Sequence, residues 1–76
     1  MSAYDFSLLA RQPIAELGLS VRIANQLRAA GITSIGELCE RRARDLLLIT
    51  HVGPDSVRAV VDALTQRGLS LRELDP

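Results

Sequence analysis

Apolar residues recur at helical spacing along much of this chain. The clearest run contains Val57, Val60, Val61 and Leu64, which follow the i, i+3, i+4, i+7 pattern of one helix face. We expect this stripe to be buried. No segment alternates apolar and polar residues with the period of two that is typical of strands. The pattern predicts an all-α fold, a compact bundle of roughly four to five short helices.

A repeat divides the chain into two similar halves. Residues 20–38 (SVRIANQLRAAGITSIGEL) match residues 56–74 (SVRAVVDALTQRGLSLREL). In each half, a helix is expected to begin near the serine and to end at Gly31 or Gly68, because glycine readily adopts the left-handed conformation of a helix C-cap. The repeat therefore predicts two helix–hairpin–helix halves.

Each of these glycines is followed by the signature of another helix start. Ser34 with Glu37, and Ser70 with Glu73, have the spacing of a capping box. In this motif the serine caps the helix N-terminus, and the glutamate accepts a hydrogen bond from the N–H of the capping residue. We expect a helix or a helical turn to begin at each serine.

The segments outside the repeat are also expected to contact the core. Residues 1–12 are predicted to form an N-terminal arm whose Leu8, Leu9 and Phe6 pack on the domain formed by residues 13–76.

The connection between the halves is unusually apolar. Residues 46–49 (LLLI) lie in a segment, residues 44–50, that is too short for an independent helix and too apolar for an exposed loop. We predict one buried helical turn there, leading into a hairpin at residues 51–54.

Composition narrows the possible functions. The chain is 47% hydrophobic but has one Phe, one Tyr and no Trp, so its core must be aliphatic. Nine basic and nine acidic residues give a net charge of zero, so DNA binding would have to come from a local patch. Because no signal peptide or long apolar run is evident, we expect a cytoplasmic protein without a membrane partner.

The residues needed for catalysis or metal binding are scarce. Cys39 is the only cysteine, which excludes an internal disulfide and a thiol cluster for a metal, and we expect it to be a half-buried structural thiol. His51 is the only histidine, and the acidic residues show no pairing typical of an active site. We therefore expect no enzymatic activity, no metal and no cofactor.

The hairpin at residues 51–56 (HVGPDS) is the best candidate for a binding element. Such a hairpin brings backbone N–H groups and the positive end of the next helix to a phosphate oxygen. Gly53 permits close approach, Pro54 suits the first helical position, and Ser56 offers a hydroxyl. The alternative is that Gly53 and Pro54 only shape the start of a helix.

Several short pieces of residues 7–71 together form a family signature: residues 17–22 (LGLSVR) with Asn25, Gly31-Ile32 with residues 35–38 (IGEL), Gly53 with Ser56, and residues 67–71 (RGLSL). In these pieces the sequence resembles the C-terminal domain of the bacterial RNA polymerase α subunit, which is also a doubled helix–hairpin–helix fold.

The resemblance implies binding to the minor groove of A/T-rich DNA upstream of promoters. Arg22 and Asn25 match the principal DNA-contacting pair of the family, and Gly53 and Ser56 match positions that contact the DNA backbone. His51 stands in the same hairpin, where asparagine is usual. A narrow A/T-rich groove concentrates negative potential, which favours a planar guanidinium such as that of Arg22.

Other positions depart from the family pattern. Pro54-Asp55 replaces a basic residue, and Ala59 replaces a glutamate. Asp55 interacts favourably with the helix dipole but repels a phosphate, so we expect weak DNA binding. If the protein binds DNA, we expect it to be associated with the nucleoid. Met1 lies only about 20 residues before the motif, so the sequence is either an excised domain or a free-standing relative of the family, and the loss of basic residues near Ser56 favours the relative.

Two other functional hypotheses remain open. The family also contacts activators and the sigma factor; Arg41, Arg42 and Arg44 lie in the region that meets activators, and Glu16 lies near the sigma-facing surface. In the first hypothesis, the protein is an interaction domain for RNA polymerase, sigma factor or an activator. The alternative for the arginines is that they only form a solvated helix end.

In the second hypothesis, the protein is a generic helix–hairpin–helix module of a repair enzyme, which would bind duplex DNA without A/T preference.

Overall fold

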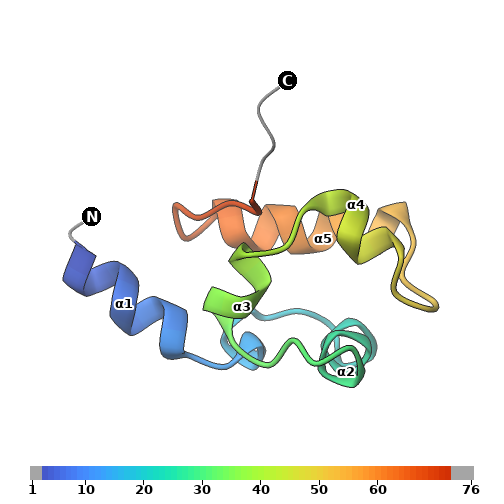
Figure 1. The fold of residues 1–76 in the computed structure, drawn as a ribbon, viewed down its shortest axis with the longest axis horizontal. Helices are drawn as coiled ribbons and strands as arrows, with labels where there is room; N and C mark the ends of the chain where they lie inside the picture. The colour runs from blue at the N-terminus through green and yellow to red at the C-terminus, as the bar shows by residue number, and fades with distance from the viewer. Residues whose placement is uncertain (1–2, 73–76) are drawn as a thin grey trace.

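The computed structural model of the protein describes residues 3–72, and the side chains of residues 7–72 (Figure 1). The helices are α1 (Ala3–Arg11), the short 3-10 helix η1 (Ile14–Leu17), α2 (Val21–Ala29), α3 (Ile35–Cys39), α4 (Ala43–Leu47) and α5 (Pro54–Thr65). Apart from an isolated bridge between Pro13 and Ser34, no β structure occurs in residues 3–72, so the all-α prediction is confirmed. None of these helices is long and apolar enough to span a membrane.

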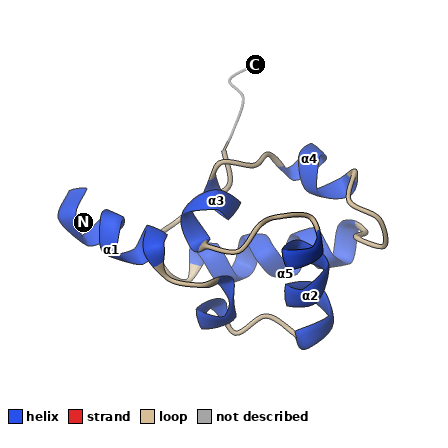
Figure 2. Cartoon of the chain, turned by 60° about the horizontal axis from the view of Figure 1, so that its bottom comes forward, coloured by secondary structure: helices blue, strands red, loops and turns tan. Residues whose placement is uncertain are grey.

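The helices surround one aliphatic core. Figure 2 shows α1 extending from one side of the bundle, and α1 packs on α3 while α4 packs on α5. The most deeply buried side chains come from η1, the helices α2 to α5 and the turn after α2: Ile14, Leu27, Ile32, Ile35, Leu38, Leu46, Val60 and Leu64. The core is therefore aliphatic, as the composition requires.

The helix of the first half begins and ends where the sequence predicts. Ser20 is the N-cap of α2, and its hydroxyl accepts a hydrogen bond from the N–H of Ile23 at 3.2 Å. After the helix, Gly31 has a φ of +87°, and the Ile32 N–H donates to the Leu27 carbonyl at 2.9 Å. This bond turns Ile32 back into the core.

The helix of the second half ends in the same way, but no helix follows it in the described residues. Gly68 has a φ of +73°, and the Leu69 N–H donates to the Leu64 carbonyl at 2.9 Å. Residues 70–72 are not helical, so the helical start predicted at Ser70 is wrong for these residues. Glu73 lies outside the described residues. The Arg72 N–H instead donates to the carbonyl of Arg41 at 2.9 Å, which holds this segment against the α3–α4 connection.

The capping box of the first half is confirmed. The Ser34 hydroxyl accepts from the Glu37 N–H at 3.2 Å, and the Glu37 carboxylate accepts from the Ser34 N–H at 3.0 Å. The same carboxylate accepts from the hydroxyl of Thr33 at 2.8 Å and from its N–H at 3.0 Å. These hydrogen bonds, led by the one from the Thr33 hydroxyl, lower the pKa of Glu37 from 4.5 to about 2.

Within the predicted N-terminal arm, helix α1 packs closely on α3. A Cβ atom added at Gly36 would lie 2.9 Å from the Ala10 Cβ and 3.0 Å from the Ala10 carbonyl oxygen, so a glycine is needed at this contact. Leu9 is half-buried, whereas the predicted packing of Leu8 is wrong because about half of its surface faces solvent. The Phe6 side chain lies outside the described side chains.

The predicted burial of the α5 stripe is correct at three of its four positions. Val57, Val60 and Leu64 are buried. Val61 is 38% exposed, so its predicted burial is wrong, because the core covers only part of the predicted stripe.

The segment between the halves is helical, as α4, but only Leu46 among its leucines is buried. Leu47 is half-exposed, and Leu48 at the end of the helix is 84% exposed. A short helix that packs on α5 has one covered side, and successive leucines cannot all lie on it.

Candidate nucleic-acid interface

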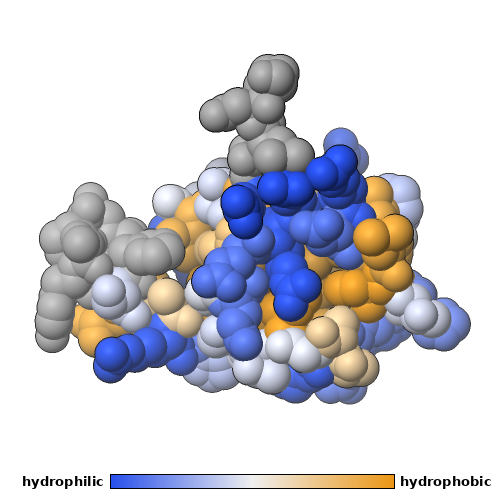
Figure 3. All heavy atoms as spheres, in the orientation of Figure 1, coloured by the Kyte–Doolittle hydropathy of each residue, from blue (hydrophilic) through white to orange (hydrophobic). Residues whose placement is uncertain are grey.

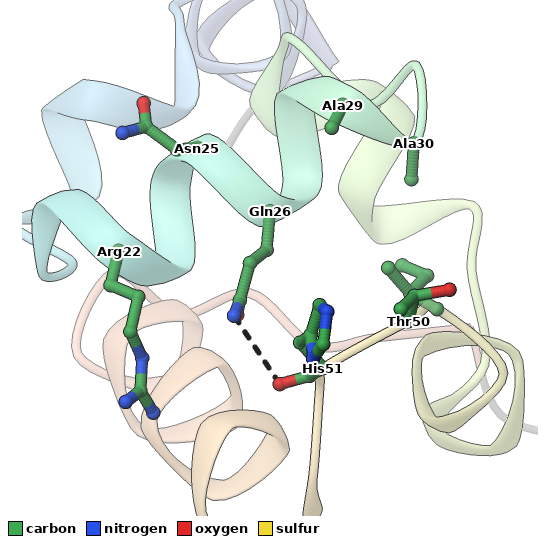
Figure 4. A pocket seen from close by; sticks show the side chains of 8 residues that line it. Arg22, Asn25, Gln26, Ala29, Ala30, Thr50 and His51 are labelled. Atoms are coloured by element: carbon green, nitrogen blue, oxygen red, sulfur yellow. Dashed lines mark hydrogen bonds between the residues drawn. The ribbon is translucent and has the colours of Figure 1, made fainter.

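A groove of about 530 Å³ separates α2 from the loop between α4 and α5 (Figure 4). The residues that line it are Arg22, Asn25, Gln26, Ala29, Ala30, Ile49, Thr50 and His51. The groove thus brings together three of the five residues predicted to contact DNA, from segments that lie far apart in the sequence.

Arg22 gives the groove its positive charge. Because Ser20 caps α2, Arg22 falls in the first turn of the helix, where the partial positive charge of the helix dipole is concentrated. No acidic residue lies in that turn to offset it. The side chain is exposed and extends along the groove toward α5 (Figure 4). This end of α2 therefore attracts anions.

Asn25 lies at the rim of the groove and is turned away from His51 (Figure 4). Its Oδ1 atom accepts a hydrogen bond from Nη1 of Arg28 at 3.1 Å. The two residues are three apart on α2 and so lie on one face of the helix. Arg28 was not among the residues predicted to bind DNA, although its i, i+3 spacing from Asn25 was a signal for the pair.

His51 belongs to the wall of the groove opposite Arg22, and its backbone is unusual. Among residues 3–72 it is the only non-glycine residue with a positive φ, which is +70°. The His51 carbonyl accepts a hydrogen bond from Nε2 of Gln26 at 3.3 Å. Gln26, which lies one turn after Arg22 on α2, was not among the predicted site residues.

The other two predicted DNA contacts lie at the start of α5. Gly53 is the N-cap, in an extended conformation, and Pro54 takes the first helical position as predicted. The first α-helical hydrogen bond runs from the Val57 N–H to the Gly53 carbonyl at 3.1 Å, so the N–H groups of Asp55 and Ser56 precede it. Gly53 has no side chain to cap them.

The Ser56 side chain is buried. It is only 5% exposed, because it lies in the first turn of α5 on the side that faces the core. The hairpin therefore offers backbone N–H groups more readily than the Ser56 hydroxyl. Asp55, in contrast, is exposed in the same turn of the helix.

The residues predicted to meet proteins have different surroundings. Arg41 and Arg44 are exposed, whereas Arg42 is half-buried as the N-cap of α4, where its N–H donates to Oδ2 of Asp45 at 3.0 Å. Leu47 and Leu48, which follow these arginines in the sequence, are exposed, and an apolar patch lies over α4 (Figure 3).

Glu16 lies in η1, apart from the arginine cluster. Its side chain is exposed, and its backbone carbonyl accepts a hydrogen bond from the guanidinium of Arg67. This contact links the turn after α5 to η1.

Cys39 is half-buried at the end of α3, and its burial raises the pKa of the thiol. In the part of the protein that the structure describes, no three His, Cys, Asp or Glu residues are grouped as metal ligands would be.

The sequence is similar to a known protein family and to known RNA polymerase subunits. The family of the C-terminal domain of the bacterial RNA polymerase alpha subunit matches residues 7–66. The protein is 42% identical over 65 residues to the DNA-directed RNA polymerase subunit alpha of Carboxydothermus hydrogenoformans, a match that covers 86% of this sequence and 21% of the relative. The subunit alpha of Cutibacterium acnes is 42% identical over 64 residues, with coverage of 84% and 19%. The sequence thus spans about a fifth of the length of these relatives.

Proposed function

Because the protein belongs to the family of the C-terminal domain of the bacterial RNA polymerase alpha subunit, and is therefore a transcription-associated module, we propose that it binds the minor groove of A/T-rich duplex DNA. In this proposal the guanidinium of Arg22 enters the groove, and backbone N–H groups at the start of α5 bind a flanking phosphate. Asn25 and His51 contact the DNA at the rim of the protein's own groove.

The observation that carries the proposal is the position of Arg22 across the groove from the α4–α5 hairpin. A/T-rich minor grooves are narrow and strongly negative, so a flat cation that donates several hydrogen bonds fits them well. An uncapped helix start binds phosphate without any basic side chain. Together the two elements supply one contact to base edges and one to the backbone, which fixes the register.

Affinity is expected to be weak. The net charge is zero, and the exposed carboxylate of Asp55 lies in the same turn as the proposed phosphate-binding N–H groups. If about two or three phosphates are neutralised, the logarithm of the binding constant should fall with a slope of roughly 2 to 3 against the logarithm of salt concentration.

The test is a titration of isotope-labelled protein with an A/T-rich and a G/C-rich duplex at low salt, followed by NMR. We expect the largest amide shifts at Arg22, Asn25 and residues 51–56, with stronger binding to the A/T-rich duplex. Arg22→Ala should abolish the shifts. Arg11→Ala, which removes an exposed charge from α1, is the matched control and should leave them unchanged. Equal binding to both duplexes, or binding that survives Arg22→Ala, would contradict the proposal.

A second candidate function is protein interaction, and the exposed face of α4 favours it. Arg44, Leu47 and Leu48 are related by i, i+3 and i+4 and share that face, with Leu48 almost fully exposed. A charged and apolar surface of this kind suits a transcription protein such as RNA polymerase, sigma factor or an activator. Binding of purified RNA polymerase or sigma factor that survives Arg22→Ala but is lost in an Arg44→Glu, Leu48→Ser variant would establish it.

A further inference from the structure

We infer that Gln26 is a positioning residue, whose side-chain amide holds the α4–α5 hairpin so that the start of α5 faces the same DNA as Arg22. The inference rests on the proposed function for its consequence in DNA binding. Its structural part, the restraint on the hairpin, is measurable in the protein alone.

The backbone of His51 shows that the hairpin needs such a restraint. Its φ of +70° is disfavoured for a residue with a side chain, because the Cβ atom approaches the carbonyl oxygen. Such a conformation persists only where the surrounding structure holds it. The hydrogen bond from Nε2 of Gln26 to the His51 carbonyl, at 3.3 Å, provides that hold from a helix 25 residues earlier in the sequence.

The state of the Gln26 side chain supports the same role. The residue is half-buried, and its Oε1 atom is buried without a hydrogen-bond partner in the structure. An apolar side chain of similar length would fill this space without burying an unpaired acceptor. Compared with such an apolar side chain, the Gln26 amide therefore contributes only its hydrogen bond to the hairpin.

The arrangement of the helices links this bond to both proposed DNA contacts. Gln26 lies one turn after Arg22 on α2, so both side chains extend into the groove (Figure 4). On the other side, His51 is followed by the buried Val52 and by Gly53, the N-cap of α5. One side chain thus fixes the element that carries the guanidinium relative to the element that carries the N–H groups.

The experiment compares Gln26→Met, which keeps the length but removes the donor, with Gln66→Met, the same change at the exposed C-cap of α5. In the free protein, hydrogen exchange and ¹⁵N relaxation should show faster exchange and greater mobility for residues 51–56 in Gln26→Met only. With an A/T-rich duplex, the same variant should lose affinity by roughly fivefold to tenfold, because the hydrogen bonds to one phosphate are lost. The DNA-induced amide shifts of Asp55 and Ser56 should shrink, while that of Arg22 should be kept.

The pattern of amide shifts separates positioning from general loss of stability. A variant that is only partly folded loses affinity, but its folded molecules show the wild-type shifts at saturating DNA. Loss of the α5 contact instead reduces the shifts of Asp55 and Ser56 relative to that of Arg22. Should Gln26→Met fail to fold, Gln26→Glu repeats the loss of the donor at nearly constant size for the measurements on the free protein. Unchanged exchange at residues 51–56, or unchanged amide shifts of Asp55 and Ser56 at saturating DNA, overturns the inference. A loosened hairpin in a protein whose wild type does not bind either duplex refutes the proposed function but not the restraint by Gln26.

Discussion

The two halves of this domain carry the same three residues, Ser-Val-Arg, near the start of their long helices, and the serine has a different place in each. In α2 the serine, Ser20, is the N-cap, and its hydroxyl accepts a hydrogen bond from the first turn. In α5 the helix begins earlier, at Pro54, so that the equivalent Ser56 lies inside the helix and is buried. Gly53, which has no side chain, is the N-cap there.

The same local motif therefore occurs at one helix start that has a side-chain cap and at another that has none. At α2, the capping group belongs to the protein, and the functional residue of the turn is the side chain of Arg22. At α5, the N–H groups receive no side-chain cap, and the proposed ligand is a phosphate. The C-terminal ends show no such difference, because Gly31 and Gly68 make equivalent turns.

The largest effect is expected from Leu27→Ala and Leu64→Ala, which alter equivalent positions of the two halves. Each leucine is fully buried, and its carbonyl accepts the bond that closes the glycine turn. Each variant should lose about 2–5 kcal/mol of unfolding free energy in urea titrations. If the halves share one core, circular dichroism and residue-resolved hydrogen exchange will report one transition. Loss of protection in only one half would show that the halves are independent.

Gly36→Ala tests an addition that only the first half has, the packing of α1 on α3. The new methyl group would overlap the Ala10 Cβ and carbonyl oxygen, so we expect a loss of roughly 1–3 kcal/mol or release of α1. Urea titration and hydrogen exchange in α1 would measure it. Gly53→Ala is the control, since its Cβ meets no atom within 4 Å and its φ is negative. Equal losses in both variants would contradict the close contact.

Ser20→Ala and Ser56→Ala compare the two serines of the repeat directly. Loss of the cap at Ser20 should lower the unfolding free energy by about 1 kcal/mol. Ser56 does not cap α5, and alanine is a better helix former, so its replacement should cost distinctly less. The urea midpoints of the two variants would give the two losses of unfolding free energy. A larger loss in Ser56→Ala than in Ser20→Ala would contradict the different roles of the two serines.

The capping box of the first half should make stability depend on acid. Folding lowers the pKa of Glu37 from 4.5 to about 2, so its stabilising contribution is complete above about pH 4.5 and is lost as the pH falls toward 2. Glu37→Gln should therefore be less stable than the wild type at pH 6, and the gap should close in acid. Thermal unfolding of both proteins between pH 6 and pH 2 would show this; a constant gap would contradict it.

The smallest effect on stability is expected from Gly53→Asp, which gives α5 the cap that α2 already has. The extended backbone at Gly53 accepts any side chain, and the new carboxylate should raise the unfolding free energy by a few tenths of a kcal/mol. The same group would occupy the N–H groups of α5 and repel phosphate, so binding to an A/T-rich duplex should weaken. Tighter DNA binding by this variant would exclude a phosphate site at α5.

Local chemistry made part of this fold predictable from sequence. The all-α class, the helix ends at Gly31 and Gly68, the capping box of Ser34 and Glu37, and Pro54 at the start of α5 all follow from residues within one or two turns of each other. The failure at Ser70 shows the limit of such signals, because a motif that suffices locally is overridden when the backbone bonds to a distant segment, here at Arg41.

The sequence by itself therefore determined the ends of the two long helices, the start of α3, and which residues resemble those of a DNA-binding family. Only the tertiary structure decided which faces are covered, so that Val61 and Leu48 are exposed while Ser56 is buried. It also decided that Arg22 and His51 share a groove and that Gln26 bonds across it. Caps depend on neighbours in the sequence, whereas burial and grooves depend on the packing of segments that are distant in sequence.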